Sequence, residues 1–162
     1  MTFFKKKITT EEMAKNLYFA TVLNTVKEDL KDQDGNIILT KKELILMLTQ
    51  HLYALFEKHN LEKAKLYLLT THVVNSTKIK NNDDLTFEMA ISLDAIEKIR
   101  NFLQQFPAPE ESHKFFKAKF LFDKDLDPTQ KTLAMARYVI YCKVIDSVFE
   151  STVKKFKVVE KE

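Results

Sequence analysis

The chain has 162 residues, of which 45% are hydrophobic and 30% charged, and its formal net charge is +3. This composition is typical of one soluble globular domain, and we expect residues 1–162 to form it, with flexible ends at 1–8 and 155–162. One glycine and three prolines are too few for a turn-rich β fold, so helix is favoured. The small net charge and the scarcity of arginine argue against nucleic acid as a partner.

Several classes of site and location are excluded by residue usage. A single glycine leaves no room for a phosphate-binding P-loop, a dinucleotide fingerprint or a nucleophile elbow, so we expect no cofactor and favour a non-enzymatic role. Cys142 is the only cysteine, which indicates a reducing, cytoplasmic location. No uncharged run approaches the roughly 18 residues of a membrane span, and residues 1–8 lack the pattern of a signal peptide.

Two helices are predicted in the first part of the chain, each after a capping-box pattern: Thr9 with Glu12, and Thr40 with Glu43. The first should run to near Asp32, because apolar residues recur there at steps of three and four. Its stripe is Met13, Leu17, Ala20, Leu23, Val26 and Leu30. The second should run to about residue 58, and it is apolar on nearly all sides, which places it at the centre of the core.

The segment 32–43 between these helices carries oxygen-bearing side chains at the spacing of a calcium loop. Its side-chain ligand positions hold Asp32, Asp34, Asn36, Thr40 and Glu43. In this spacing the segment resembles the EF-hand family, which implies a calcium ion bound by these five residues. The sixth position departs from the family, because it holds Ile37 where the sharp turn needs glycine. We favour instead a plain turn at Asp34-Gly35, with Thr40 and Glu43 serving only as a cap, and keep the calcium site as the alternative.

The middle of the chain is less clear. A third helix is predicted from Leu61 with Asn60 as its cap, and Leu61, Ala64, Leu68 and His72 share one side. Residues 75–84 are polar and indicate a loop. Residues 85–93 alternate like a strand, but 85–106 also carries a helical stripe, and we favour helix there. Residues 114–122 are equally compatible with a strand or a short helix.

The last predicted helix has the clearest start, with Asp127 as N-cap, Pro128 at the first position and Gln130 at the third. We expect it to be followed by a frayed tail. The fold class is therefore mainly α: a single-domain helical bundle of five or six helices, with room for a small β element. The alternative is an α+β fold with strands near 85–93 and 114–122.

The surplus of apolar helix face favours a non-enzymatic intracellular protein that acts through a protein partner or self-association, in an interaction or regulatory role. The expected contact surfaces are residues 115–122 and, on the last helix, Tyr138, Tyr141, Ile145 and Phe149. One alternative is a calcium-responsive helical protein that uses the loop at 32–43. A further alternative is a di-metal carboxylate bundle, because Glu110 and His113 match the Glu-x-x-His unit that such bundles use twice.

Overall fold

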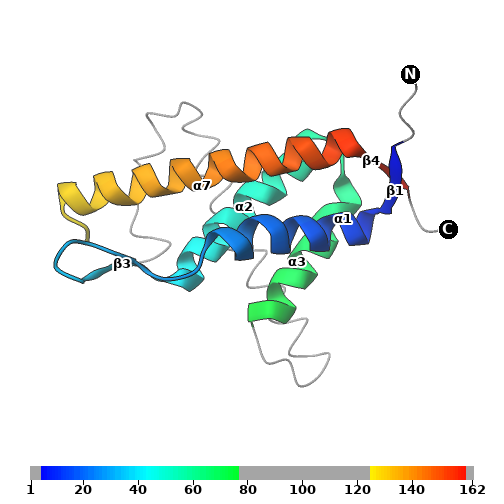
Figure 1. The fold of residues 1–162 in the computed structure, drawn as a ribbon. Helices are drawn as coiled ribbons and strands as arrows, with labels where there is room; N and C mark the ends of the chain where they lie inside the picture. Colours follow the sequence, from blue (N-terminus) through cyan, green and yellow to red (C-terminus); the bar gives the residue numbers. More distant parts are fainter. Residues whose placement is uncertain (1–4, 77–124, 160–162) are drawn as a thin grey trace.

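The computed structural model describes residues 5–76 and 125–159, which form a mainly helical molecule with two small β elements (Figure 1). In chain order the elements are β1 (Lys6–Thr9), α1 (Thr10–Leu17), the π-helix η1 (Tyr18–Leu23), β2 (Leu30–Lys31), β3 (Ile37–Leu39), α2 (Lys41–Lys58), α3 (Glu62–Ser76), α7 (Pro128–Lys155) and β4 (Phe156–Val159). The predicted mainly α class with a small β element is confirmed. Among the described residues, no helix combines the length and the hydropathy that a membrane crossing requires.

Several predictions concern residues outside the described ranges. These are the loop at 75–84 beyond residue 76, the strand or helix at 85–93, the helix to 106, the Glu110–His113 unit and the segment 114–122. The part of the predicted five or six helices that falls between 77 and 124 lies there as well. The strands that the structure describes are elsewhere, in the two pairs β1–β4 and β2–β3.

Three of the predicted helix starts, at Thr9, Thr40 and Asp127, are confirmed, each as a reciprocal capping box. At α2, for example, the Thr40 hydroxyl accepts from the Glu43 amide at 3.2 Å, and the Glu43 carboxylate accepts from the Thr40 amide at 2.8 Å. Each box satisfies two amides that have no partner within the helix, and a cap of this kind stabilises a helix by about 1 kcal/mol. Local sequence therefore fixes where these helices begin.

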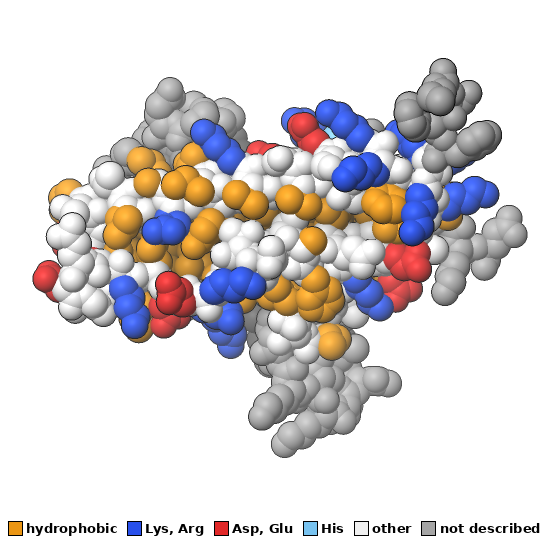
Figure 2. Space-filling model, viewed as in Figure 1, with side chains coloured by type: hydrophobic (Ala, Val, Ile, Leu, Met, Phe, Trp, Pro, Cys, Tyr) orange, Lys and Arg blue, Asp and Glu red, His pale blue; other side chains and the backbone are white. Residues whose placement is uncertain are grey.

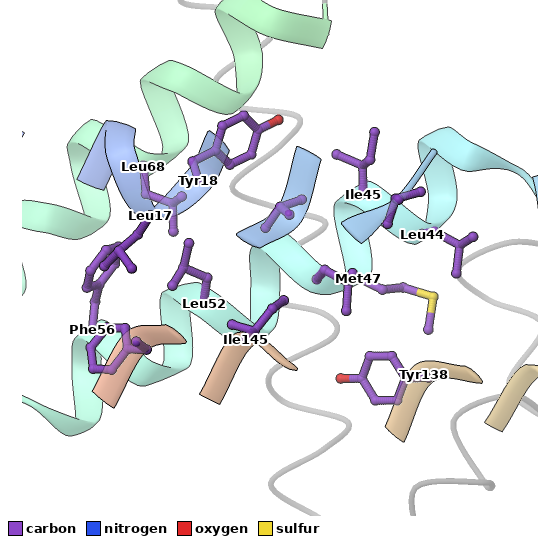
Figure 3. Packing of buried hydrophobic residues seen from close by; sticks show 14 of the residues in the cluster. Leu17, Tyr18, Leu44, Ile45, Met47, Leu52, Phe56, Leu68, Tyr138 and Ile145 are labelled. Atoms are coloured by element: carbon purple, nitrogen blue, oxygen red, sulfur yellow. The ribbon is translucent and has the colours of Figure 1, made fainter. Parts of the chain in front are cut away.

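Helix α2 lies at the centre of the core, as its apolar surface predicts. It contacts α3, η1 and α7, and its buried side chains include Leu44, Met47, Leu48, Leu52 and Phe56. Figure 3 shows side chains from α1, α3 and α7 meeting those of α2. Burying one such side chain contributes about 1.5–3 kcal/mol, so α2 holds the other helices together.

The first helix differs from its prediction in its pitch and in its end. Ala20 is exposed and Leu23 only half-buried, whereas Thr21 and Val22 are buried. Buried positions recur every four residues, which on a regular α-helix would rotate the stripe by about 40° per step. The wider turn of η1 removes this rotation. The helical segment ends near residue 25, and Leu30 then begins β2 instead of extending the helix to Asp32.

The two ends of the chain, which were expected to be flexible, contain paired strands. β1 lies parallel to β4, with Lys6 opposite Phe156 and Thr9 opposite Val159. Ile8 is buried, and its partner Val158 packs partly against the core. One face of this pair is therefore apolar, which is why the pair rests on the helices.

The turn between α2 and α3 corrects the predicted role of Asn60. Its φ is 57°, and the Leu61 amide donates to the Phe56 carbonyl at 2.9 Å while the Asn60 amide donates to the Glu57 carbonyl at 3.1 Å. This is a Schellman motif, so Asn60 ends α2. Asparagine is tolerated there because its short polar side chain adopts the left-handed conformation more easily than most others.

The left-handed conformation of Asn60 predicts an unusual ranking of variants. Asn60→Gly should keep or raise the free energy of unfolding, and Asn60→Ala should lower it by about 1 kcal/mol. Asn24 is the matched control, because its φ is −74° and alanine should be better than glycine there. Urea unfolding measures all four variants. The same ranking at both positions would contradict the role given to Asn60.

Candidate functional site

The segment that resembles a calcium loop is the turn of a β-hairpin. β2 and β3 pair in antiparallel fashion, with Leu30 opposite Leu39 and Lys31 opposite Ile37. Gly35 supplies the left-handed residue of the turn, at a φ of 85°. The turn therefore has its left-handed residue at Gly35, and Ile37, where an EF-hand would need glycine, lies in strand β3.

The Asp32 carboxylate organises this hairpin from inside its turn. One oxygen accepts from the amides of Asp34 at 3.0 Å and Asn36 at 2.8 Å. The other oxygen accepts from the side-chain amides of Asn36 at 3.1 Å and Gln130 at 3.0 Å. The hydrogen bond from Gln130, followed by those from Asn36, lowers the pKa of Asp32 below its usual value. Asp32 thus links the hairpin to the first turn of α7.

The other predicted calcium ligands have structural roles or stand apart. Thr40 and Glu43 form the cap of α2, Asn36 bonds to Asp32, and Asp34 is exposed. Within residues 5–76 and 125–159, no three His, Cys, Asp or Glu side chains gather as a metal site would require. The resemblance to an EF-hand is one of side-chain spacing, whereas the backbone is a hairpin.

The contact surface predicted on α7 corresponds to its buried side. Tyr138, Ile145 and Phe149 are in the core, and only Tyr141 of the predicted set is half-buried. These residues face α2, whose Phe56 meets the Phe149 ring edge-on with centroids 5.6 Å apart. This is a correction, because an apolar stripe on a long helix signals burial without showing what covers it. The exposed large apolar side chains of α7 are Ile140 and Val144.

A surface hollow of about 460 Å³ lies between the α1–η1 segment and α3, and we call it the α1–α3 groove. Its lining residues are Glu11, Lys15, Phe19, Tyr67, Thr70, Thr71, Val74 and Asn75. Three of them are exposed apolar or aromatic side chains: Phe19 at 50%, Tyr67 at 36% and Val74 at 56%. Figure 2 shows apolar side chains open to solvent over this part of the molecule. The groove was not predicted from the sequence.

One wall of the groove comes from η1, where two neighbouring aromatic residues project in different directions. Tyr18 is fully buried, whereas Phe19 is half-exposed and lines the groove. Their rings meet edge-on with centroids 5.7 Å apart. The Phe19 ring therefore packs against Tyr18, and about half of its surface remains exposed to solvent. π-Turns of this kind occur often at functional sites.

A buried polar cluster holds Tyr18 in turn. Its hydroxyl lies 3.1 Å from Nδ1 of His72 on α3, and the Thr49 hydroxyl on α2 lies 3.5 Å from the same nitrogen. The Thr49 hydroxyl donates to the Ile45 carbonyl at 2.7 Å. Burial, with a smaller contribution from the charge of Lys42, lowers the pKa of His72 to about 4. His72 is consequently neutral and links η1, α2 and α3.

One further polar contact joins α2 to α7, and burial affects two titratable side chains of α7 itself. Nε2 of His51 on α2 lies 2.7 Å from a carboxylate oxygen of Asp146 on α7. Burial raises the pKa of the Cys142 thiol to about 12, and burial also raises the pKa of Tyr138 well above its usual value. A thiol in this state stays protonated and is a poor nucleophile.

The role of Asp32 predicts that its loss loosens the hairpin and its link to α7. Asp32→Ala should lower the Tm, because two loop amides and two side-chain amides lose their acceptor. Asp34→Ala, two residues away on the same exposed turn, is the matched control and should change the Tm little. Thermal unfolding followed by circular dichroism measures both variants.

The hairpin also predicts the response to calcium. Calcium at about 1 mM, which saturates most EF-hands, should leave the Tm of the protein unchanged. A rise in Tm that disappears in Glu43→Gln would instead support the calcium-responsive alternative, since that family places its bidentate ligand at this position.

The low pKa of His72 predicts a loss of stability in acid. The unfolded chain protonates this histidine near pH 6.5, whereas the folded protein does so only near pH 4. The contribution of neutral His72 to the free energy of unfolding is therefore complete above pH 6.5. It is lost progressively as the pH falls towards 4, by about 3 kcal/mol at most. Urea unfolding across this range should show the loss, and His72→Gln should be less stable at pH 7 but lack this part of the pH dependence. An equal pH dependence in both proteins would contradict the assignment.

No family model, curated protein or solved structure matches the chain. The function must therefore be inferred from the geometry of the described residues, among which the α1–α3 groove is a feature open to a ligand. Aromatic side chains beside a hollow are a common feature of binding sites.

Proposed function

We propose that the protein is a non-enzymatic, intracellular interaction protein whose α1–α3 groove binds an apolar segment of a partner protein. The observation that supports this is the exposure of Phe19, Tyr67 and Val74 around one hollow. Three large side chains exposed singly would be ordinary, but their grouping at a concave place is typical of a contact surface.

The groove has the composition of a small protein-binding site. Phe19 and Tyr67 come from different helices and supply aromatic surface, which often carries most of the energy in such contacts. Thr70, Asn75 and the ion pair of Lys15 with Glu11, at 2.8 Å, supply polar groups. A groove between two helices suits the apolar face of an amphipathic helix. We therefore propose such a helix as the partner segment.

The state of the titratable side chains supports a binding role over a catalytic one. His72 is neutral and enclosed by Tyr18 and Thr49, and the Cys142 thiol is protonated. Neither group is among the residues that line the groove. The single cysteine of the sequence suits a reducing compartment, which supports the proposed cytoplasmic location.

The proposal is tested with two double variants that remove similar apolar surface from different places. Phe19→Gln with Tyr67→Gln alters the groove, and Ile140→Gln with Val144→Gln alters the exposed side of α7. Capture of a partner by the purified protein should fall at least about tenfold in the groove variant, because two aromatic contacts are lost. The α7 variant should capture the partner as the unaltered protein does.

Two results would contradict this function. Equal losses in both variants would show that capture depends on general hydrophobicity, and a loss only in the α7 variant would move the site to Ile140 and Val144. Size-exclusion chromatography at rising concentration separates a second protein from a second copy of this chain. If the groove variant abolishes a dimer, the partner is the chain itself.

A further inference from the structure

The parallel pairing of β1 with β4 brings lysines from the two ends of the chain to one place. The exposed lysines on these strands and beside them, which we call the terminal lysine cluster, are Lys5, Lys6, Lys7, Lys154, Lys155 and Lys157. Figure 2 shows basic side chains gathered at the end of the molecule where both termini leave it. In the sequence these residues are two separate short runs, so only the fold makes them one surface.

Three of these lysines share the outer face of the strand pair. Lys7 lies directly opposite Lys157, and register partners in a parallel pair project to the same face. Lys5 precedes Lys7 by two residues and so continues this face. The other face carries Ile8 and Val158, which pack on the core. Like charges directly opposite each other destabilise a strand pair, so this arrangement weakens the fold.

Within residues 5–76 and 125–159, the carboxylates near these lysines have other partners. Among the described residues, no ion pair within 4.0 Å joins any of the six lysines to a carboxylate. The nearby Glu11 pairs with Lys15 at 2.8 Å, and the Glu12 carboxylate accepts from the Thr9 amide at 3.0 Å. Elsewhere in the described residues acidic side chains outnumber basic ones. The net positive charge of this part of the chain is thus concentrated at one end.

The α7 helix explains only part of the cluster. Lys154 and Lys155 lie in the last turn of α7, where the helix dipole favours positive charge. Lys5, Lys7 and Lys157 have no such explanation, because they lie on or beside the strands. A bound anionic surface would relieve their mutual repulsion.

We propose that the terminal lysine cluster binds the anionic surface of a lipid membrane. Lysines without arginine suit the diffuse attraction of a charged leaflet, whereas nucleic acid sites rely on arginine forks and stacked aromatic rings. The face that Lys5, Lys7 and Lys157 share lies on one side of a strand pair, which suits a planar surface. In the sequence Phe3 and Phe4 directly precede Lys5, and apolar residues beside a basic run are common in interfacial anchors.

The test measures how the full chain binds to vesicles of phosphatidylcholine with about 30% phosphatidylserine, and to vesicles of phosphatidylcholine alone, at low salt. The variant is Lys5→Gln with Lys7→Gln and Lys157→Gln. The control, Lys41→Gln with Lys58→Gln and Lys143→Gln, removes the same charge from scattered exposed positions. Each lysine near the surface contributes about fivefold, so the variant should bind on the order of 100-fold more weakly and the control nearly as the unaltered protein does.

Folding of the variant is checked by its Tm, which should not fall, because the repulsion between Lys7 and Lys157 is removed. Equal losses in variant and control would overturn the proposal, as would equal binding to neutral vesicles. Single-stranded DNA bound more tightly than the anionic vesicles at the same salt would assign the cluster to nucleic acid. Competition by millimolar inorganic phosphate would assign it to a small anion.

Discussion

The wide turn of η1 is the feature on which the arrangement of the helices depends. Core positions in the first helical segment recur every four residues, and a regular α-helix would turn the later ones away from α2 and α3. With the π-turn in place, Tyr18 reaches His72 and Val22 remains buried. Phe19, the neighbour of Tyr18 in the same turn, lies at the surface and lines the groove, so η1 contributes both to the core and to the groove.

Three of the helix starts were predictable because their signals are local. A capping box needs only two residues three apart, and Thr9, Thr40 and Asp127 all act as predicted. The central place of α2 was predictable for a related reason, since a helix that is apolar on nearly all sides must be covered. The π-turn was not predictable in this way, because it depends on the elements against which the helix packs in the folded structure.

The two strand pairs and the groove could not be predicted either, because they also depend on contacts between residues far apart in the sequence. Lys6 pairs with Phe156 across nearly the whole chain, and nothing in either short segment specifies the other. The groove combines residues of α1, η1 and α3 whose spacing in the sequence follows no single period. The predicted surface on α7 was misplaced for a similar reason, because periodicity shows that a face is apolar but not whether α2 lies on it.

The hairpin around Asp32 shows that one pattern of residues is compatible with two structures, a calcium-binding loop and a tight β-hairpin turn. Acidic and amide side chains at alternating positions can surround a cation, but they can equally accept and donate within a tight turn. Here the backbone selects between them. The left-handed residue is Gly35, so the oxygens of Asp32 point at amides of the turn and at Gln130.

The pairing of the chain ends also bears on the order of folding. Joining β1 to β4 in an unfolded chain closes a loop of about 150 residues, at an entropic cost of about 4 kcal/mol, and a two-stranded sheet alone is marginal. The cost falls sharply once α1 and α7 have docked on α2, so the strands should join last and separate first. During synthesis β4 follows β1 only after about 150 further residues, so the surface that the two strands share cannot form before β4 has left the ribosome.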